Sequence, residues 1–367
     1  MGFKALCLGL FCAFFASRMY VPIPGDIEEY WKVAALDIFA KICTFMAMCF
    51  ESIGIIKYEE YVTVMDTTFV HVPVRLYLPK RKSETPRQAV IYLHGGAFCF
   101  GSFKNTAFDS LNRWTAKKLD AVVVGVDYRL APQHCFPVAH EDSFTAIKFF
   151  LQDEILAKYG LDPTRICILG VICRGLPVQN DPEFKHKIKT QALLYPSLQM
   201  IDCHLPSHQE NEHGIVLTKD LAIKFVSLYF TNDEILYQAM RRNEHMPLES
   251  RHLFKLFRKD YVYTEPILGR YNYSWPVLTD IRALPLLAND SWLQNFPPTY
   301  VLTCQYDLVR DDGVMYVSRL QNVGVQGTHD HIENGIHGAL SYTEFPLYLR
   351  LGFRIRDMYI SWLDKNL

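Results

Sequence analysis

Short apolar runs alternate with longer segments of mixed polarity along most of the chain. Continuous runs of aliphatic and β-branched residues are typical of strands that are covered on both faces. Segments long enough to be crossover helices separate these runs. The predicted strands are residues 89–93, 121–126, 165–169, 191–195 and 299–304, and the predicted helices are residues 108–119, 137–159, 313–323 and 347–363. This order favours an α/β fold with one mostly parallel sheet.

Two stretches depart from this alternation. Residues 204–282 break the pattern, and residues 27–55 are rich in Ala, Phe, Met and Ile, with Asp37 and Lys41 spaced to pair on a helix surface. We expect residues 26–57 and 204–282 to form a mostly helical cap over the carboxyl ends of the strands, where sheets of this kind bind ligands. Residues 19–367 are thus predicted to form a single domain that includes the cap.

The composition excludes several classes of function. The chain has 367 residues, half of them hydrophobic, and a net charge of −1, which is enough apolar material for a large core. Its longest block of basic residues is Lys80-Arg81-Lys82, so we do not expect a nucleic-acid partner. The ten cysteines lack the spacing of zinc ligands, and the sequence indicates no metal ion and no cofactor.

The N-terminus resembles a targeting signal. Lys4 precedes an apolar run, residues 5–16, which ends shortly before Arg18. A membrane span needs ~20 apolar residues, so residues 1–18 fit a signal peptide better than a full span. A cleaved signal peptide and an uncleaved signal-anchor with membrane association both agree with the pattern, and a buried N-terminal helix is the alternative. Either signal predicts the secretory pathway, with the body secreted or in the lumen of the endoplasmic reticulum.

Two sequons agree with this compartment. Asn272-Tyr273-Ser274 and Asn289-Asp290-Ser291 match the acceptor triplet for N-glycosylation. Such triplets also arise by chance, so glycans on Asn272 and Asn289 are predictions that depend on the signal.

A glycine-rich turn follows the first predicted strand. The run His94-Gly95-Gly96-Ala97-Phe98 stands directly after residues 89–93. Glycines let the backbone turn tightly and present neighbouring N–H groups to a developing oxyanion. Gly95 and Gly96 are therefore candidate oxyanion donors, although such a turn in isolation is equally compatible with a structural role.

A second motif turns these signals into a resemblance. After the next predicted strand stands Asp127-Tyr128-Arg129-Leu130-Ala131-Pro132. The pair of motifs resembles the hormone-sensitive-lipase branch of the α/β-hydrolases, and the likeness to the arylacetamide deacetylase group extends over nearly the whole chain. The resemblance implies an α/β-hydrolase fold with a helical cap, and a small apolar ester or amide as substrate.

The resemblance also implies a catalytic acid and a base. Asp307, at the end of Thr303-Cys304-Gln305-Tyr306-Asp307, matches the acid, and His337, within Asn334-Gly335-Ile336-His337-Gly338, matches the base. In such hydrolases the triad follows the order Ser, Asp or Glu, His. Asp307 would orient the imidazole, and His337 would take the proton of the nucleophile and return it to the leaving group.

The nucleophile of this triad is missing. Where the family has G-[DE]-S-x-G-G, the chain has Gly170-Val171-Ile172-Cys173-Arg174-Gly175, which puts Ile172 in the place of the serine. An isoleucine side chain cannot attack a carbonyl carbon. Pro177 and Pro182 follow, and the stretch is shorter than that of the family by about two helical turns. We expect the nucleophile elbow and its helix to be lost between Gly170 and Pro182.

Two alternatives concern the same stretch. Cys173 is a weak substitute nucleophile, because Val171 stands where an elbow has glycine, although the neighbouring Arg174 would favour a thiolate. The other alternative is a frameshifted or mis-spliced reading of the gene. If residues 172–175 are back-translated with the permitted codons ATC, TGC, AGG and GGN, a shift by one base reads Ser-Ala-Gly-Gly, although these codons are only one choice among several.

The deacetylase resemblance further implies a disulfide between Cys99 and Cys304, with two free thiols as the alternative.

The sequence is compatible with two competing functions. One is a secretory-pathway hydrolase of carboxylic esters or arylamides that works through an acyl-enzyme. The other is a catalytically inactive relative that at most binds apolar acyl ligands.

Overall fold

The computed structural model describes residues 61–170, 181, 184, 186–214, 216–247, 250–254, 275–344 and 347–367. The chain divides into two compact units, Met1–Glu59 and Glu60–Leu367, and the described residues all belong to the second. The predicted signal segment, residues 1–18, and the cap segment 26–57 lie outside the described residues, as do Ile172 and Cys173. The predicted boundaries of the domain and its cap therefore stay predictions.

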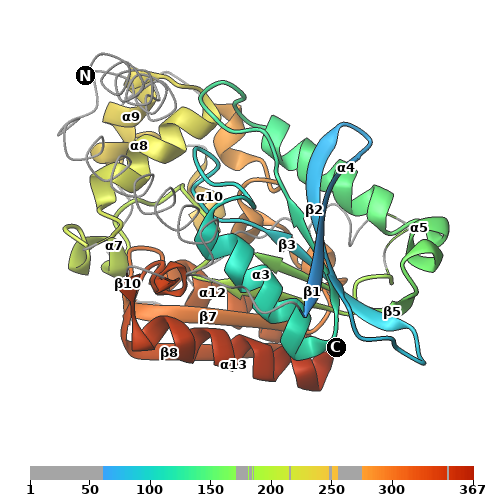
Figure 1. The fold of residues 1–367 in the computed structure, drawn as a ribbon. Coiled ribbons are helices and arrows are strands. Elements are labelled where there is room, and N and C mark those ends of the chain that lie inside the picture. The colour runs from blue at the N-terminus through green and yellow to red at the C-terminus, as the bar shows by residue number, and fades with distance from the viewer. Residues whose placement is uncertain are drawn as a thin grey trace, which may run out of the picture. The chain divides into compact units, whose positions relative to one another are not determined.

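Within the described residues, eight strands form one sheet in the order β1-β2-β4-β3-β5-β6-β7-β8 (Figure 1). β2 pairs antiparallel with both β1 and β4, whereas the other pairs of this sheet are parallel. The prediction of a mostly parallel sheet is confirmed. The strands are β1 (Val62–Phe69), β2 (Val72–Pro79), β3 (Arg87–Leu93), β4 (Val122–Val126), β5 (Leu161–Gly170), β6 (Thr190–Leu194), β7 (Thr299–Tyr306) and β8 (Gly327–Ile336).

Three of these strands, β1, β2 and β8, are not predicted from the sequence. β1 and β2 form a hairpin whose two-residue turn, Val70-His71, has none of the usual Gly, Asn or Asp residues, and Val70 adopts a φ of 58°. β8 lies at the edge of the sheet and is mostly polar and only partly buried. β8 therefore lacks the apolar run by which buried central strands are recognised, and in β2 the buried residues are interrupted by Pro73 and Arg75.

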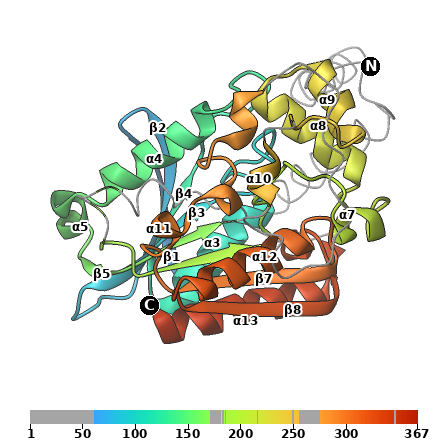
Figure 2. The same ribbon diagram turned by 180° about the vertical axis from the view of Figure 1, so that it is seen from behind.

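Helices cover both faces of the sheet. Figure 1 shows α3 (Thr106–Leu119) and α13 (Arg350–Asn366) on the near face, and Figure 2 shows α12 (Arg310–Asn322) on the opposite one. α4 (Val138–Phe150) packs on the same side as α12, with Ala146, Ile147 and Phe150 buried against the face of β3 that α3 does not cover. The helix predicted over residues 137–159 is interrupted, because extended backbone at Gln152 separates α4 from α5 (Asp153–Lys158).

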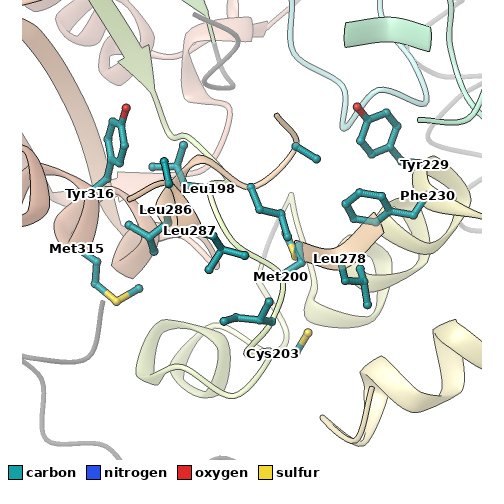
Figure 3. Packing of buried hydrophobic residues seen from close by; sticks show 14 of the residues in the cluster. Leu198, Met200, Cys203, Tyr229, Phe230, Leu278, Leu286, Leu287, Met315 and Tyr316 are labelled. Atoms are coloured by element: carbon teal, nitrogen blue, oxygen red, sulfur yellow. The ribbon is translucent and has the colours of Figure 1, made fainter. Parts of the chain in front are cut away.

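The second half of the predicted cap is mostly helical where it is described. One continuous apolar cluster joins it to the sheet, and Figure 3 shows this cluster running from Met315 and Tyr316 of α12, past Met200 and Leu278, to Tyr229 and Phe230 of α8. The helices between Pro206 and Leu293 are α7 (Pro206–Glu210), α8 (Lys219–Phe230), α9 (Glu234–Arg241), α10 (Arg251–Phe254), α11 (Asp290–Leu293) and the 3-10 turns η2 (Pro276–Thr279) and η3 (Pro285–Leu287). Short elements complete the C-terminal part, namely η4 (Ala339–Ser341), β9 (Thr343–Glu344) and β10 (Leu347–Tyr348). None of the helices in the described ranges has the length and apolar content of a membrane span.

Buried polar groups fasten the cap to the sheet domain. Asp312 of α12 is fully buried and accepts hydrogen bonds from the backbone N–H groups of Leu198 and Gln199, at 2.8 and 3.2 Å. Burial raises the pKa of this carboxyl to about 7. The buried ring of His245 donates from Nε2 to the Met200 carbonyl at 2.7 Å, and burial lowers its pKa to about 4. The loop that follows β6 is thus held from two sides.

The buried His245 makes stability depend on pH. Its folded pKa of about 4 is below the ordinary value of 6.5, so the folded state favours the neutral ring. The contribution to stability is complete above pH 6.5 and is lost as the pH falls towards 4, at up to about 1.4 kcal/mol per pH unit. We expect His245→Gln, which keeps a donor for the Met200 carbonyl, to flatten this acid-side decline in urea unfolding. Asp312 is present in both proteins, so its titration affects the two free energies of unfolding equally. If these free energies fall in parallel as the pH is lowered, the prediction is contradicted.

Candidate active site

The candidate site residues stand on loops at one edge of the sheet. β3, β7 and β8 run in the same direction, and Gly95, Asp307 and His337 each come within two residues of a strand's carboxyl end. Carboxyl ends of parallel strands meet at one edge, which is where α/β folds bind their ligands. The described part of the chain has no cluster of residues that could hold a metal ion.

Asp307 and His337 form a hydrogen-bonded pair. The imidazole Nδ1 lies 2.9 Å from Asp307 Oδ1, which fixes Nδ1 as the donor and leaves Nε2 as the nitrogen that can accept a proton. The Asp307 side chain is 1% exposed and the His337 side chain 21% exposed, so the acid is buried while the base reaches solvent. This arrangement brings the predicted acid and base together across 30 residues of sequence.

The loop of Asp307 is fixed by its neighbours. The Val309 N–H donates to Asp307 Oδ1 at 3.0 Å, and the Asn211 side chain, from the segment after α7, donates to the Asp307 carbonyl at 3.3 Å. The other carboxylate oxygen, Oδ2, is buried and has no hydrogen-bond partner among the described residues. The contact with His337 is therefore central to satisfying this buried charge. The sequence gives no signal for Asn211, which lies far from any motif.

The predicted oxyanion loop follows β3 and has little conformational freedom. Gly96 has a φ of 117°, and a Cβ built there would lie 1.9 Å from the Phe100 carbonyl oxygen, so no other residue fits. Ala97 and Phe98 also have positive φ values, of 50° and 62°. Among the described residues, no acceptor is bonded to the N–H groups of Gly95 and Gly96. Gly95 and Gly96 therefore remain the candidate oxyanion donors.

A buried aromatic pair holds this loop. The Tyr128 ring stacks on the His94 ring with centroids 4.1 Å apart, and its hydroxyl donates to the His94 carbonyl at 2.6 Å. On the cap side, the Phe98 ring stacks on Tyr229 of α8, with centroids 3.9 Å apart. Tyr128 stands in the motif that carries the family resemblance, and the structure gives it the role of supporting the oxyanion loop.

The nucleophile position itself lies outside the described residues. β5 ends at the centre of the sheet with Gly170, which pairs with Leu93 of β3 and Leu193 of β6 and stands two residues before Ile172 in the sequence. The predicted loss of the elbow and its helix between Gly170 and Pro182 stays a prediction, as does the weak substitute role of Cys173.

The predicted disulfide between Cys99 and Cys304 is not formed in the structure, where both are free thiols. Cys99 packs on the cluster under the cap and its Sγ donates to the Phe225 carbonyl at 3.4 Å, whereas Cys304 belongs to the cluster under α3 and α13 and lies against Gly335. The two side chains thus pack in separate apolar clusters. Burial raises the pKa of both thiols to about 12, which makes them poor nucleophiles at neutral pH.

One of the two predicted glycosylation sites can be placed. Asn289 is exposed, and its Oδ1 caps α11 by accepting from the Trp292 N–H at 3.0 Å. Since a glycan attaches to Nδ2, this cap is compatible with the modification. Asn272 lies outside the described residues.

An open hollow lies beside the acid–base pair. Its volume is about 390 Å³, and Tyr306 and Ile336, which directly precede Asp307 and His337, form one wall. The opposite wall comes from the end of α7 and the segment after it, and the lining residues are Gln209, Glu210, Asn211, Glu212, His213 and Gly214. The residues that line the hollow on the cap side are mostly polar in type, but most of the lining surface is apolar.

Comparisons with known proteins agree with this geometry. The chain matches the family described as alpha/beta hydrolase fold over residues 90–248 and 235–341. It is 66% identical to human arylacetamide deacetylase-like 2 and 43% identical to mouse arylacetamide deacetylase, covering 100% and 99% of this chain and the whole of each relative.

A solved structure gives the same fold. The hyperthermophilic esterase from the archaeon Pyrobaculum calidifontis superposes with a TM-score of 0.65 and 24% identity, covering 89% of this chain and 90% of the esterase. This likeness extends to the arrangement of the sheet and its helices. The sequence identities to the deacetylases show that the chain belongs to the arylacetamide deacetylase family of α/β-hydrolases.

Proposed function

We propose that this chain binds small apolar carboxylic esters and arylamides but does not turn them over through an acyl-enzyme. The observation that carries the proposal is an assembled Asp307–His337 pair in a chain whose sequence has Ile172 in the place of the nucleophile. The printed names of its relatives, deacetylases and an esterase, support the class of ligand.

The chemistry explains why the remaining groups bind without efficient turnover. In a serine hydrolase, the base removes the hydroxyl proton while the oxygen forms a bond to the carbonyl carbon, and the oxyanion donors stabilise the resulting charge. Here His337 has an acid to orient it but no hydroxyl to deprotonate at residue 172. The Gly95 and Gly96 N–H groups still offer hydrogen bonds to a carbonyl oxygen, which favours binding of the ester or amide.

A second candidate is an active serine hydrolase encoded by a fuller reading of the same gene. The alignment with the human relative runs over 401 positions, whereas this chain has 367 residues, so the relative contains segments that this chain lacks. Sequencing of transcripts across residues 169–182 decides between the two candidates. A transcript that encodes a serine elbow there would replace the binding proposal for the natural protein.

The proposal predicts that the Asp307–His337 pair does not contribute to ester hydrolysis. We expect no labelling of the purified chain by a fluorophosphonate probe, with mouse arylacetamide deacetylase as the positive control. Hydrolysis of p-nitrophenyl butyrate should change by no more than about twofold in His337→Ala, because one triad member contributes little once another is absent. Labelling of the wild-type chain, or a decrease of about 10²-fold in the hydrolysis rate of His337→Ala, would show an active nucleophile.

The loss of a whole positioning segment predicts that a point change does not restore activity. We expect Ile172→Ser to remain unlabelled by the fluorophosphonate probe, since an elbow needs small residues and a following helix as well as the serine. Replacement of residues 170–182 by the corresponding segment of the human relative should produce labelling. Strong labelling of the point variant would instead mean that the elbow is intact apart from its side chain.

The oxyanion loop should control binding. A Cβ at residue 96 would clash with the Phe100 carbonyl, so we expect Gly96→Ala to weaken the binding of acetanilide about fivefold to tenfold in calorimetric titration. Gly324→Ala is the matched control, because Gly324 has a φ of 83° but open space around it and lies away from the site. Equal affinities of the two variants would exclude the loop from binding.

A further inference from the structure

Tyr195 has a backbone conformation that its residue type disfavours. It directly follows β6, is buried, and has a φ of 44°. A bulky side chain at positive φ is an outlier in proteins, and such residues concentrate at functional sites. The next residue, Pro196, further favours an extended conformation for Tyr195. The surrounding structure must therefore hold this conformation in place.

The positive φ changes the face on which the side chain lies. Successive residues of a strand point to opposite faces, so Tyr195 would be expected on the face opposite to Leu194. Instead both side chains belong to the apolar cluster under α3 and α13, together with Ala339 and Leu340. The unfavourable backbone conformation thus directs the phenol ring towards the turn that follows His337.

The ring reaches both sides of the acid–base pair. Its centroid lies 5.4 Å from that of the His337 ring, and its hydroxyl accepts a hydrogen bond from the Leu340 N–H at 3.2 Å. The Tyr195 N–H donates to the Leu302 carbonyl of β7, the strand that leads to Asp307, at 2.9 Å. One residue therefore links the acid-bearing strand to the turn after the base.

We propose that Tyr195 is a positioning residue that holds His337 against Asp307. The turn after His337 begins with Gly338 at a φ of 70° and continues as η4 (Ala339–Ser341), and the Leu340 N–H within it is bound by the phenol. The imidazole itself is 21% exposed, so packing alone does not fix it. The contacts are intrinsic to the folded chain, so the role does not depend on whether an ester is turned over.

The test uses the full chain with uniform nitrogen labelling and no ligand, so that both the His337 imidazole and the Leu340 amide are observed. The proton on His337 Nδ1, bonded to Asp307, gives a resonance that is assigned by its absence in His337→Gln. We expect Tyr195→Leu, which removes the ring and the hydroxyl, to abolish or broaden this resonance. Tyr195→Phe keeps the ring, so the resonance should persist while the Leu340 amide exchanges with solvent about fivefold faster, the effect of one lost hydrogen bond.

Tyr359→Phe is the matched control. Tyr359 of α13 lies fully buried in the same apolar cluster, and its hydroxyl bonds to Thr115 rather than to the turn after the base. The control should leave both the histidine resonance and the exchange of Leu340 unchanged, even if it lowers the unfolding temperature. An unchanged histidine resonance in Tyr195→Leu would overturn the proposal. If that variant does not fold, unchanged exchange of Leu340 in Tyr195→Phe would overturn it as well.

Discussion

Parallel strand pairing is the constraint on which the rest of this structure depends. β3, β5, β6, β7 and β8 run in one direction, which requires crossover connections between them and apolar cover on both faces. The same pairing makes the carboxyl ends of these strands meet at one edge. The oxyanion loop and the acid–base pair, which lie far apart in the sequence, are therefore brought to the same edge by the sheet.

The segment after β5, which we predict to be shortened, lies next to the centre of the sheet. A helix that follows the nucleophile normally covers this part of the sheet, and its loss would expose apolar strand surface. Ile166 and Ile168 of β5 are nevertheless buried, in a cluster that also contains Phe184 and Ile188 from the segment leading into β6. Lys148 of α4 reaches over the Phe184 ring, with its ammonium 5.0 Å from the ring centroid. The returning chain thus supplies apolar cover next to β5.

The acid–base pair is maintained by contacts that do not involve a nucleophile. The buried Asp307 carboxylate is bonded to the Val309 N–H and to His337, and Asn211 holds its backbone. A buried charge left without partners costs several kcal/mol, on the order of the whole stability margin of a domain. The contacts that hold this pair in the folded chain do not involve residue 172.

The sequence by itself determined the central strands and the crossover helices, and it placed the glycine-rich loop, Asp307 and His337 at strand ends. These features depend on local apolar runs and on motifs at strand ends, which are visible in a single chain. It did not predict the β1–β2 hairpin, whose turn lacks Gly, Asn and Asp, or β8, whose residues are mostly polar and only partly buried. It also predicted a Cys99–Cys304 disulfide that the separate packing of the two thiols does not support. Only the tertiary structure decided the roles of Asn211, Tyr128 and Tyr195, because each acts through contacts with residues distant in sequence. Tyr195 is the clearest case, since its position depends on a positive φ that neither its residue type nor the following proline would predict.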